Sequence, residues 1–407
     1  MKISKACFGF WALAILYLTP IKGTSAQLQS YVATSGVYAK NPPDPTLFDG
    51  DTQSLQRLFF RQIIKGQPIK RWRAEFNGFA FLQGSSEKGT LDRYLISNFD
   101  QINRSSELHR NWHESDALTG LWAVDRLNMR GSVGRMQLAL GRYPIDFSKT
   151  FIYRPNDLFA PFRPYQFDRN YKAGVDAITM SYPLGTFSTF RWINVAGYES
   201  QEPEGNQTRN KFSEKLSSSL FHYSDNIEDY YLAAFAGKHR QSSILGVSAE
   251  GEVAKSLGFH MDFHQLLPDD SRAAYVEAAL SFDYRWSHKS IFQLEFYNHG
   301  AGYNDKNRYT ELEEDPNRPV THLSRRYAGG VFTHDYNPLT TIRTMIQKNL
   351  VDQSVLGTFY IKRSLGQASE LTLIINNSNG ESPVDSIVKT EYGSYPKMMS
   401  IEIGSYF

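Results

Sequence analysis

The sequence has a single cysteine in 407 residues, Cys7, and this residue lies inside an apolar run near the amino terminus. If that run is removed as a signal peptide, the remaining chain can form neither a disulfide nor a thiolate metal site. The sequence also lacks a C-x-x-C-H motif, so the chain cannot attach c-type haem itself. No apolar run after residue 26 is long enough for a transmembrane helix. Basic and acidic residues nearly balance, 44 against 42, which argues against nucleic acid as a partner.

The amino terminus predicts a secretory signal peptide over residues 1–26. Lys2 and Lys5 form a positive region, residues 7–18 are apolar, and small residues precede a cleavage site after Ala26. The apolar run is too short to span a bilayer. The mature protein is therefore expected to cover residues 27–407 as one β-barrel.

Aromatic residues are plentiful although the chain is polar on average. Hydrophobic residues make up 41% of the sequence, yet aromatic residues alone make up 14%, with 24 Tyr and 27 Phe. A transmembrane β-barrel needs this combination, because only alternate residues face lipid and aromatic side chains gather at both membrane interfaces. A secreted soluble all-β protein is the alternative.

Several segments, each roughly ten residues long as a tilted membrane strand requires, alternate between apolar and ionisable side chains. Residues 275–286 place Val276, Leu280 and Phe282 on one face and charged residues on the other, and residues 72–82 repeat this pattern. A soluble sandwich would turn its polar face to bulk water and would not need so many charges, so the pattern favours a barrel. The pore-lining candidates on these two segments are Arg73, Glu75, Glu277, Asp283 and Arg285.

Short turns and long polar connections alternate between the predicted strands. The sequence therefore predicts an all-β fold, a transmembrane antiparallel up-and-down β-barrel of 16–18 strands with short periplasmic turns and long extracellular loops. We predict 18 strands; 16 is the alternative, because the first two segments and residues 211–223 alternate less regularly. The predicted strands cover residues 28–39, 54–64, 71–83, 118–130, 135–143, 174–183, 186–198, 211–223, 229–238, 242–253, 256–266, 274–286, 290–299, 326–335, 340–349, 354–364, 369–377 and 397–407.

The last segment, residues 396–407 (PKMMSIEIGSYF), alternates most regularly and ends on an aromatic residue. It resembles the terminal assembly signal of Gram-negative outer-membrane β-barrels, in which the last strand closes on the first. The resemblance implies a place in the bacterial outer membrane, recognition by the barrel assembly machinery, and contact with lipid and lipopolysaccharide. We expect this strand to pair with the strand near residues 28–39. The residues on its lipid-facing side are expected to be Met399, Ile401, Ile403 and Phe407.

A barrel of 16–18 strands encloses water, so its function depends on what lines or blocks the lumen. The candidate is the connection at residues 144–172, which is too apolar to move freely in water. It is expected to pack either inward as a constriction or outside as an extracellular cap. In porins the loop after the fifth strand folds inward, and this connection resembles that loop in position. If it lines the pore, its five bases against three acids predict a weak anion preference. Its charged candidates are Asp146, Lys149, Arg154, Asp157, Arg163, Asp168, Arg169 and Lys172.

The run from Leu138 to Phe162 (LALGRYPIDFSKTFIYRPNDLFAPF), followed by Asp168 to Gly185 (DRNYKAGVDAITMSYPLG), resembles a segment of porin-like outer-membrane proteins from anaerobic and metal-reducing bacteria. Some of those barrels sheath multihaem cytochromes. The resemblance implies two functions. The first is a porin-like channel for passive diffusion of small hydrophilic solutes or ions. The alternative is a sheath that holds a partner such as a multihaem cytochrome, and a homotrimer is the porin-like expectation for assembly.

No catalytic residue, metal site or cofactor is expected. His260 and His264 lie roughly 13 Å apart along a strand, too far to share one metal ion. The segment around His299 resembles outer-membrane phospholipase, whose catalytic histidine and serine sit on the outside of the barrel. No serine stands beside His299 in that pattern, so the chain is not expected to be an enzyme.

Overall fold

The computed structural model describes residues 26–44, 51–86, 102–115, 117–162, 171–204, 207–311 and 322–407. The predicted signal peptide lies outside these residues except for Ala26, and its cleavage stays a prediction. Among the predicted loop candidates, Arg163, Asp168 and Arg169 also lie outside the described residues.

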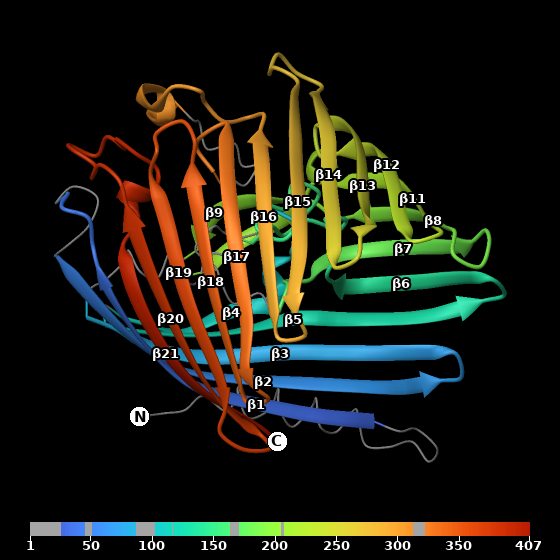
Figure 1. Ribbon diagram of the computed structural model, residues 1–407. Helices are drawn as coiled ribbons and strands as arrows, with labels where there is room; N and C mark the ends of the chain where they lie inside the picture. The colour runs from blue at the N-terminus through green and yellow to red at the C-terminus, as the bar shows by residue number, and fades with distance from the viewer. Residues whose placement is uncertain are drawn as a thin grey trace.

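Eighteen strands of the described chain pair antiparallel into a closed ring (Figure 1). They follow one another round the ring in chain order, which is the up-and-down topology that the sequence predicts. The barrel strands are β1 Ala26–Lys40, β2 Thr52–Ile69, β3 Trp72–Ser85, β5 Leu118–Val133, β6 Met136–Tyr143, β7 Val175–Pro183, β8 Thr189–Val195, β11 Ser218–Ile227, β12 Tyr230–His239, β13 Ser242–Ala254, β14 Leu257–Pro268, β15 Tyr275–Ser287, β16 Ser290–His299, β17 Arg326–Asn337, β18 Thr340–Asn349, β19 Val355–Ser364, β20 Ser369–Asn379 and β21 Lys397–Tyr406.

Three described strands and four short 3-10 helices lie outside the ring. Strand β4 (His109–Glu114) pairs with β5 along the part of its edge that β6 does not reach. Strands β9 (Tyr198–Glu204) and β10 (Gln207–Phe212) form a separate hairpin. No helix in the described part of the chain has the length and hydropathy to cross a bilayer. The helices are η1 Ser106–Leu108, η2 Glu214–Leu216, η3 Lys306–Glu311 and η4 Tyr392–Ser394.

One predicted strand, residues 211–223, is wrong in its bounds. Residues 211 and 212 end the hairpin strand β10, and the barrel strand β11 begins only at Ser218. The helical turn η2 separates them, so a single extended strand cannot run through this segment. The barrel nevertheless has 18 strands, and the first two are 15 and 18 residues long.

The two ends of the chain close the barrel. Strand β21 pairs antiparallel with β1, with Tyr406 opposite Tyr31 and Lys397 opposite Lys40. Phe407 and Ser30 exchange two backbone hydrogen bonds of 2.9 and 3.1 Å, which extend this pairing to the last residue. The predicted pairing of the terminal strand with the first strand is therefore confirmed.

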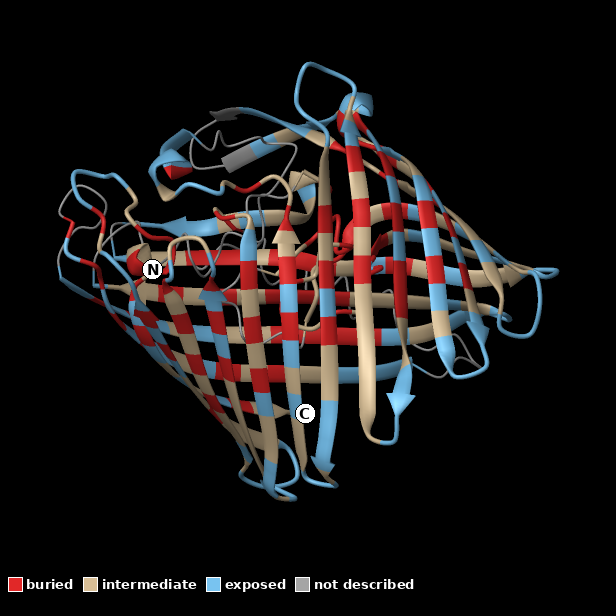
Figure 2. Ribbon diagram, turned by 45° about the horizontal axis from the view of Figure 1, so that its top comes forward, coloured by how far each residue is buried: buried red, intermediate tan, exposed pale blue. Residues whose placement is uncertain are grey.

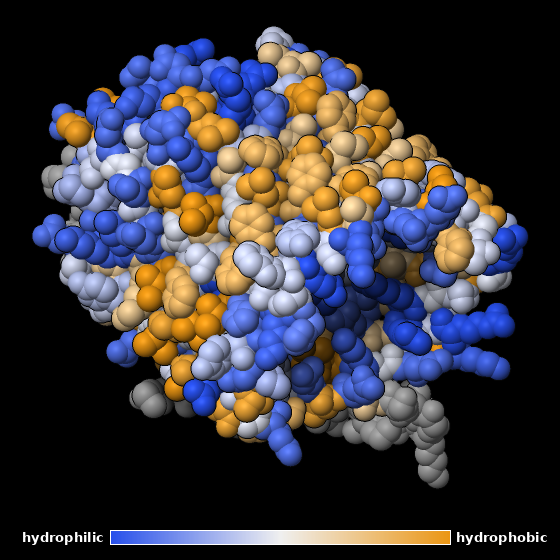
Figure 3. All heavy atoms as spheres, viewed as in Figure 1, coloured by the Kyte–Doolittle hydropathy of each residue, from blue (hydrophilic) through white to orange (hydrophobic). Residues whose placement is uncertain are grey.

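Outward-pointing side chains of the barrel strands are mostly apolar, and inward-pointing ones are mostly polar except where the loop packs against them. On β16, Phe292, Leu294 and Phe296 are 38–47% exposed, whereas Glu295 between them is fully buried. Burial alternates along the strands in the same way in Figure 2. Figure 3 shows apolar side chains on the outer surface over β14, β15 and β16. This inside-out distribution matches a lipid environment around the barrel.

The connections differ at the two ends of the barrel. At one end the strands join through tight turns, such as those between β2 and β3 and between β13 and β14, where Arg71 and Ser256 have positive φ. Residue 407 and the start of β1 lie at this short-turn end. The opposite end carries the long connections, although two of its links, after β12 and after β18, are short. The short-turn end is the periplasmic end in outer-membrane barrels.

Candidate pore and its inward-folded loop

The lumen is lined by charged side chains from opposite parts of the ring. The predicted residues Glu277, Asp283 and Arg285 on β15 alternate with the exposed Leu280 and Tyr284, so they face the lumen. On β3, the predicted Arg73 lines a cavity in the barrel, and Glu75 lies 3.5 Å from Arg126 and accepts a 3.4 Å hydrogen bond from Asn128 of β5. Asp283 lies 2.8 Å from the ring of His260 on β14, which gives that histidine a carboxylate partner.

The connection between β6 and β7 folds into the lumen. The Phe147 ring lies 5.1 Å from the ring of Phe235 on β12, and the Tyr153 ring stacks 4.9 Å from Tyr297 on β16. These partners belong to the inner face of the wall, so residues 144–162 of the loop pack inward. These contacts are those of the inward arrangement, which we propose below as a constriction.

The buried carboxylate of Asp262 on β14 holds the first part of this loop. It accepts hydrogen bonds from the Oγ of Ser148 at 2.7 Å, from the backbone N–H of Lys149 at 2.8 Å and from both the N–H and Oγ1 of Thr150. The Oγ of Ser248 on β13 donates a further bond of 2.7 Å to the same carboxylate. Asp262 is fully buried, so an unpaired charge here would be costly, and the loop supplies most of its partners.

A second buried carboxylate, Glu295 on β16, holds the next three residues. The backbone N–H groups of Phe151, Ile152 and Tyr153 donate to its two oxygens at 2.9, 3.1 and 2.6 Å. A side chain at Gly329 on β17 would meet this segment, because a Cβ there would lie 2.6 Å from the Cδ1 of Ile152. The loop is thus held on the wall by the carboxylates of Asp262 and Glu295, which accept hydrogen bonds from its N–H groups. Gly329, which has no side chain, leaves room for Ile152 of the loop.

The other limb of the loop reaches the opposite wall. Tyr171 lies beneath the guanidinium of Arg61 on β2, with 4.2 Å between the cation and the ring centroid. In the 18-strand ring β2 and β14 are nine strands apart, so they lie on opposite sides of the barrel. A loop that contacts Asp262 on β14 and Arg61 on β2 therefore spans the lumen.

Four of the predicted loop residues form one ion cluster, called here the partition cluster: Asp146, Arg154, Asp157 and Lys172. A guanidinium nitrogen of Arg154 lies 2.6 Å from Asp146, and Lys172 pairs with Asp157 and lies 3.5 Å from Asp146. Burial raises the pKa of Asp157 to about 6, although Lys172 acts in the opposite direction. The fifth described candidate, Lys149, lies apart and binds Glu250 on β13 at 2.7 Å.

Two cavities lie in the barrel, each near one end. The outer cavity, about 780 Å³, is lined by the connection between β14 and β15 and by the residues that follow β16. The inner cavity, about 790 Å³, is lined by residues next to the short turns, including Arg71 and Ser132. Asp146 lines the inner cavity, whereas Arg154 and Asp157 line the outer one. The partition cluster therefore lies where the loop separates the two cavities.

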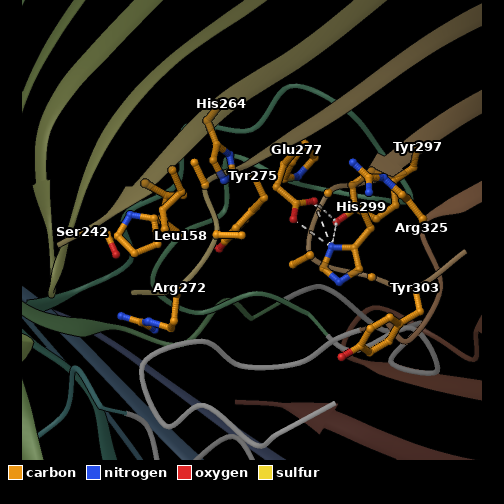
Figure 4. A pocket seen from close by; sticks show the side chains of 18 of the residues that line it. Leu158, Ser242, His264, Arg272, Tyr275, Glu277, Tyr297, His299, Tyr303 and Arg325 are labelled. Atoms are coloured by element: carbon orange, nitrogen blue, oxygen red, sulfur yellow. Dashed lines mark hydrogen bonds and ion pairs between the residues drawn. The ribbon is translucent and has the colours of Figure 1, made fainter. Parts of the chain in front are cut away.

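The outer cavity contains a buried histidine and carboxylate pair (Figure 4). The Nδ1 of His299 lies 2.9 Å from Glu277, which also accepts a 2.6 Å hydrogen bond from the hydroxyl of Tyr297. His264 stands opposite Glu277 on the neighbouring strand, so the three residues form a row across β14, β15 and β16. His299 is 5% exposed and faces the lumen, so it does not meet lipid on the outside as the catalytic histidine of outer-membrane phospholipase does.

The inner cavity is basic. Of its charged lining residues, Arg71, Arg73, Arg130 and Arg191 are cations and Asp146 is the single acid. Arg130 stands directly opposite Arg73 on the neighbouring strand. The sequence predicted Arg73 but not Arg130, although Arg130 continues the polar alternation at the end of the same strand pair. No three His, Cys, Asp or Glu side chains of the described residues are arranged to hold a metal ion.

No protein-family model and no curated protein matches the sequence. Among solved structures, the chain is similar to Acinetobacter baumannii OccAB3, with a TM-score of 0.53, 10% identity, and 94% of this chain and 99% of that chain covered. It is also similar to Pseudomonas aeruginosa OccK5 (OpdH), with a TM-score of 0.53, 8% identity, and 94% and 98% covered. A triple mutant of Rhodopseudomonas blastica porin aligns over 94% of this chain and 100% of its own, at a TM-score of 0.45 and 10% identity.

At such low identity the two matches with a TM-score of 0.53 bear on the fold alone. Together with the closed ring of 18 strands and the apolar outer surface, they define a porin-like β-barrel fold. The predicted fold class is confirmed.

Proposed function

We propose that this barrel is a channel for the passive diffusion of small hydrophilic solutes and ions across the outer membrane, with a preference for anions. The observation that carries the proposal is the loop at residues 144–162, which Asp262 and Glu295 seat inside the lumen. A barrel of this width is too wide for its side chains to fill, and a loop fixed in the lumen narrows the aqueous path. Buried donors and acceptors on both sides of the contact keep that constriction in place.

The anion preference rests on the charges along the path. The inner cavity carries four arginines against one acid, and the partition cluster has equal numbers of each sign. A lumen with excess positive charge raises the local concentration of anions and lowers that of cations. The remaining pore-lining residues of the sequence prediction are proposed to contribute to the same field.

The alternative role as a sheath for a multihaem cytochrome is less favoured by the position of the loop. A partner threaded through the lumen would have to displace aromatic side chains that are already packed there, including Phe147 and Tyr153. It would also leave the N–H groups bound to Glu295 without acceptors. We therefore keep the diffusion channel as the proposed function.

The partners follow from the outer surface and from the last strand. Lipid and lipopolysaccharide are proposed to surround the exposed apolar side chains, and strand β21 is proposed as the signal for the barrel assembly machinery. Met399, Ile401 and Ile403 are 44–47% exposed and Phe407 is 76% exposed, as a lipid-facing strand requires. A homotrimer is proposed for assembly in the membrane, and chemical crosslinking in vesicles would test it.

The proposed function is tested in a planar bilayer with the purified, folded protein. We expect single-channel conductance from the protein alone. Under a salt gradient, the sign of the reversal potential should show that anions are more permeable than cations. In the Arg73→Glu variant the permeability ratio of anion to cation should fall severalfold, because this exposed side chain lines the inner cavity.

Lys289→Glu is the matched control. It makes the same charge reversal in a turn at the same end of the barrel, but Lys289 lines neither cavity. Its selectivity should stay close to that of the unaltered protein. Folded protein that does not conduct would rule out an open pore, and equal selectivity in all three proteins would rule out the inner cavity as its source.

A further inference from the structure

The partition cluster lies between the two cavities and joins both limbs of the loop. Arg154 lines the outer cavity and binds Asp146, which lines the inner cavity. Lys172 is separated from these residues by the part of the loop beyond residue 162, yet its Nζ contacts both acids. The Nζ also donates to the backbone carbonyl of Ala160 at 3.2 Å. These contacts hold the two limbs together at the level where the lumen is divided.

We propose that the partition cluster is a selectivity gate between the two cavities, and that the charge on Asp157 sets its state. The inference rests on the proposed diffusion function. When Asp157 is charged, the cluster contains two acids and two bases, and Lys172 holds the limbs together. When Asp157 is neutral, the cluster gains one net positive charge and Lys172 loses one of its two carboxylate partners. Anions should then pass from one cavity to the other more easily.

Burial makes Asp157 the titrating member of the cluster. Asp157 is 3% exposed, whereas the side chain of Asp146 is 22% exposed and retains contact with water. Burial disfavours the charged carboxylate and raises the pKa of Asp157 to about 6, within the range that an outer membrane meets. Asp146 keeps Arg154 as a close partner in either state, so it does not act as the switch.

The walls around the outer cavity place further charges near Asp157. The same cavity is lined from the barrel by His239 of β12, Arg240, His264 of β14, Glu277 of β15 and His299 of β16. Asp262 on β14 lies beneath the loop and is held by its donors. The pH test therefore has to separate the effect of Asp157 from that of these other ionisable groups.

The direction of the pH effect follows from the raised pKa. Above pH 6 Asp157 is charged, and the two acids and two bases leave the cluster without net charge. As the pH falls through about 6, Asp157 takes up a proton and the anion preference should rise. Measured reversal potentials of the unaltered protein from pH 8 to pH 4.5 should therefore show a step to stronger anion selectivity centred near pH 6, with a two- to fivefold change in the permeability ratio.

Two variants separate Asp157 from the other groups. Asp157→Asn is isosteric and permanently neutral, so it should show the low-pH selectivity already at pH 7.5, and its step near pH 6 should be absent. Any pH dependence that it retains belongs to other ionisable groups of the lumen. Asp146→Asn removes one charge from the same cluster but leaves Asp157 in place, so it should raise anion selectivity while keeping a step.

Asp157→Glu keeps a titrating carboxylate and should keep a step, which shows that loss of the step in Asp157→Asn is not a folding defect. Heat-dependent electrophoretic mobility confirms that each barrel is folded. A step of equal size in Asp157→Asn would overturn the gate, as would a conducting protein without any step, while the channel function would stand. Absence of conductance at every pH would instead overturn both.

Discussion

At the scale of single residues, the two acids that seat the loop matter most. Asp262 and Glu295 are fully buried on the inner wall, and their partners are mostly backbone N–H groups and hydroxyls, with no basic side chain directly bound to Glu295. A carboxylate offers about four acceptor positions, so one acid can organise several consecutive donors of a loop. These acids act on permeation by positioning the loop.

The first prediction concerns Glu295→Ala. Three backbone N–H groups would lose their acceptor, and a buried donor without a partner costs about 1–3 kcal/mol. The segment at residues 151–153 should therefore leave the wall and find water. We expect a larger and noisier single-channel conductance, together with faster proteolytic cleavage within the loop.

Glu250→Ala is the control for this change. It also removes one acid from the lumen, but Glu250 binds only the side chain of Lys149 in the loop. It should alter ion selectivity slightly without added current noise or cleavage. Equal noise in the two variants would mean that charge, and not the seating of the loop, controls the current.

At the scale of elements, strands and loop connections differ in how far the sequence determines them. The alternation of side chains predicted all 18 barrel strands, because each strand has lipid on one side and the lumen on the other. It missed β4, β9 and β10, and it began β11 too early. These elements lie beyond the barrel wall, where no apolar environment imposes alternation on the side chains.

Gly329 on the inner wall leaves room for Ile152 of the loop, and the second prediction concerns its replacement by valine. In Gly329→Val the new side chain would collide with Ile152, which is buried between the loop and β17. The loop should shift away from the wall without any change in lumen charge. We expect an altered single-channel conductance at unchanged ion selectivity.

The next residue supplies the matched variant. A Cβ at Gly330 has its nearest neighbour at 3.6 Å and meets no atom of the loop. Gly330→Val should conduct like the unaltered protein. If both valine variants behave alike, strain in β17 and not the seating of the loop explains the change.

The candidate site was predicted in part. Asp146, Arg154, Asp157 and Lys172 could be named from the sequence because a loop this rich in aromatic residues has to pack. That these four residues contact one another could not be predicted from the sequence, because their contacts depend on how the loop crosses the lumen. The anchors Asp262 and Glu295 lie within two of the predicted strands, but their partners in the loop lie more than 100 residues away in sequence.

At the scale of the whole molecule, the barrel is closed by its last strand, and the outer face of that strand is apolar. The third prediction concerns Ile401→Lys in the middle of β21. Ile401 is 44% exposed on the apolar outer surface, so a charge there should cost about 2–4 kcal/mol if it lies near the bilayer midplane. We expect a lower urea midpoint for unfolding from lipid vesicles and a lower yield of folded barrel.

Ser400→Lys is the comparison, since it places the same charge one residue away on the lumen face. Its stability should change by less than about 1 kcal/mol, because the lumen side of a barrel wall is wet. Equal losses in the two variants would contradict the assignment of the outer face on this strand.

The sequence by itself determined the barrel. Apolar and polar residues alternate with a period of two in nearly every predicted strand, and the last strand ends on an aromatic residue. A closed β-barrel is the fold in which such strands have lipid outside and a polar interior. What stands inside the barrel was decided by the tertiary structure. The sequence left the packing of the loop after the fifth strand open, and in the structure this loop donates hydrogen bonds to buried carboxylates of distant strands. The alternation along a strand shows whether a side chain points outward or into the lumen. The contact of a loop with strands on the opposite side of the barrel depends instead on how the whole sheet closes.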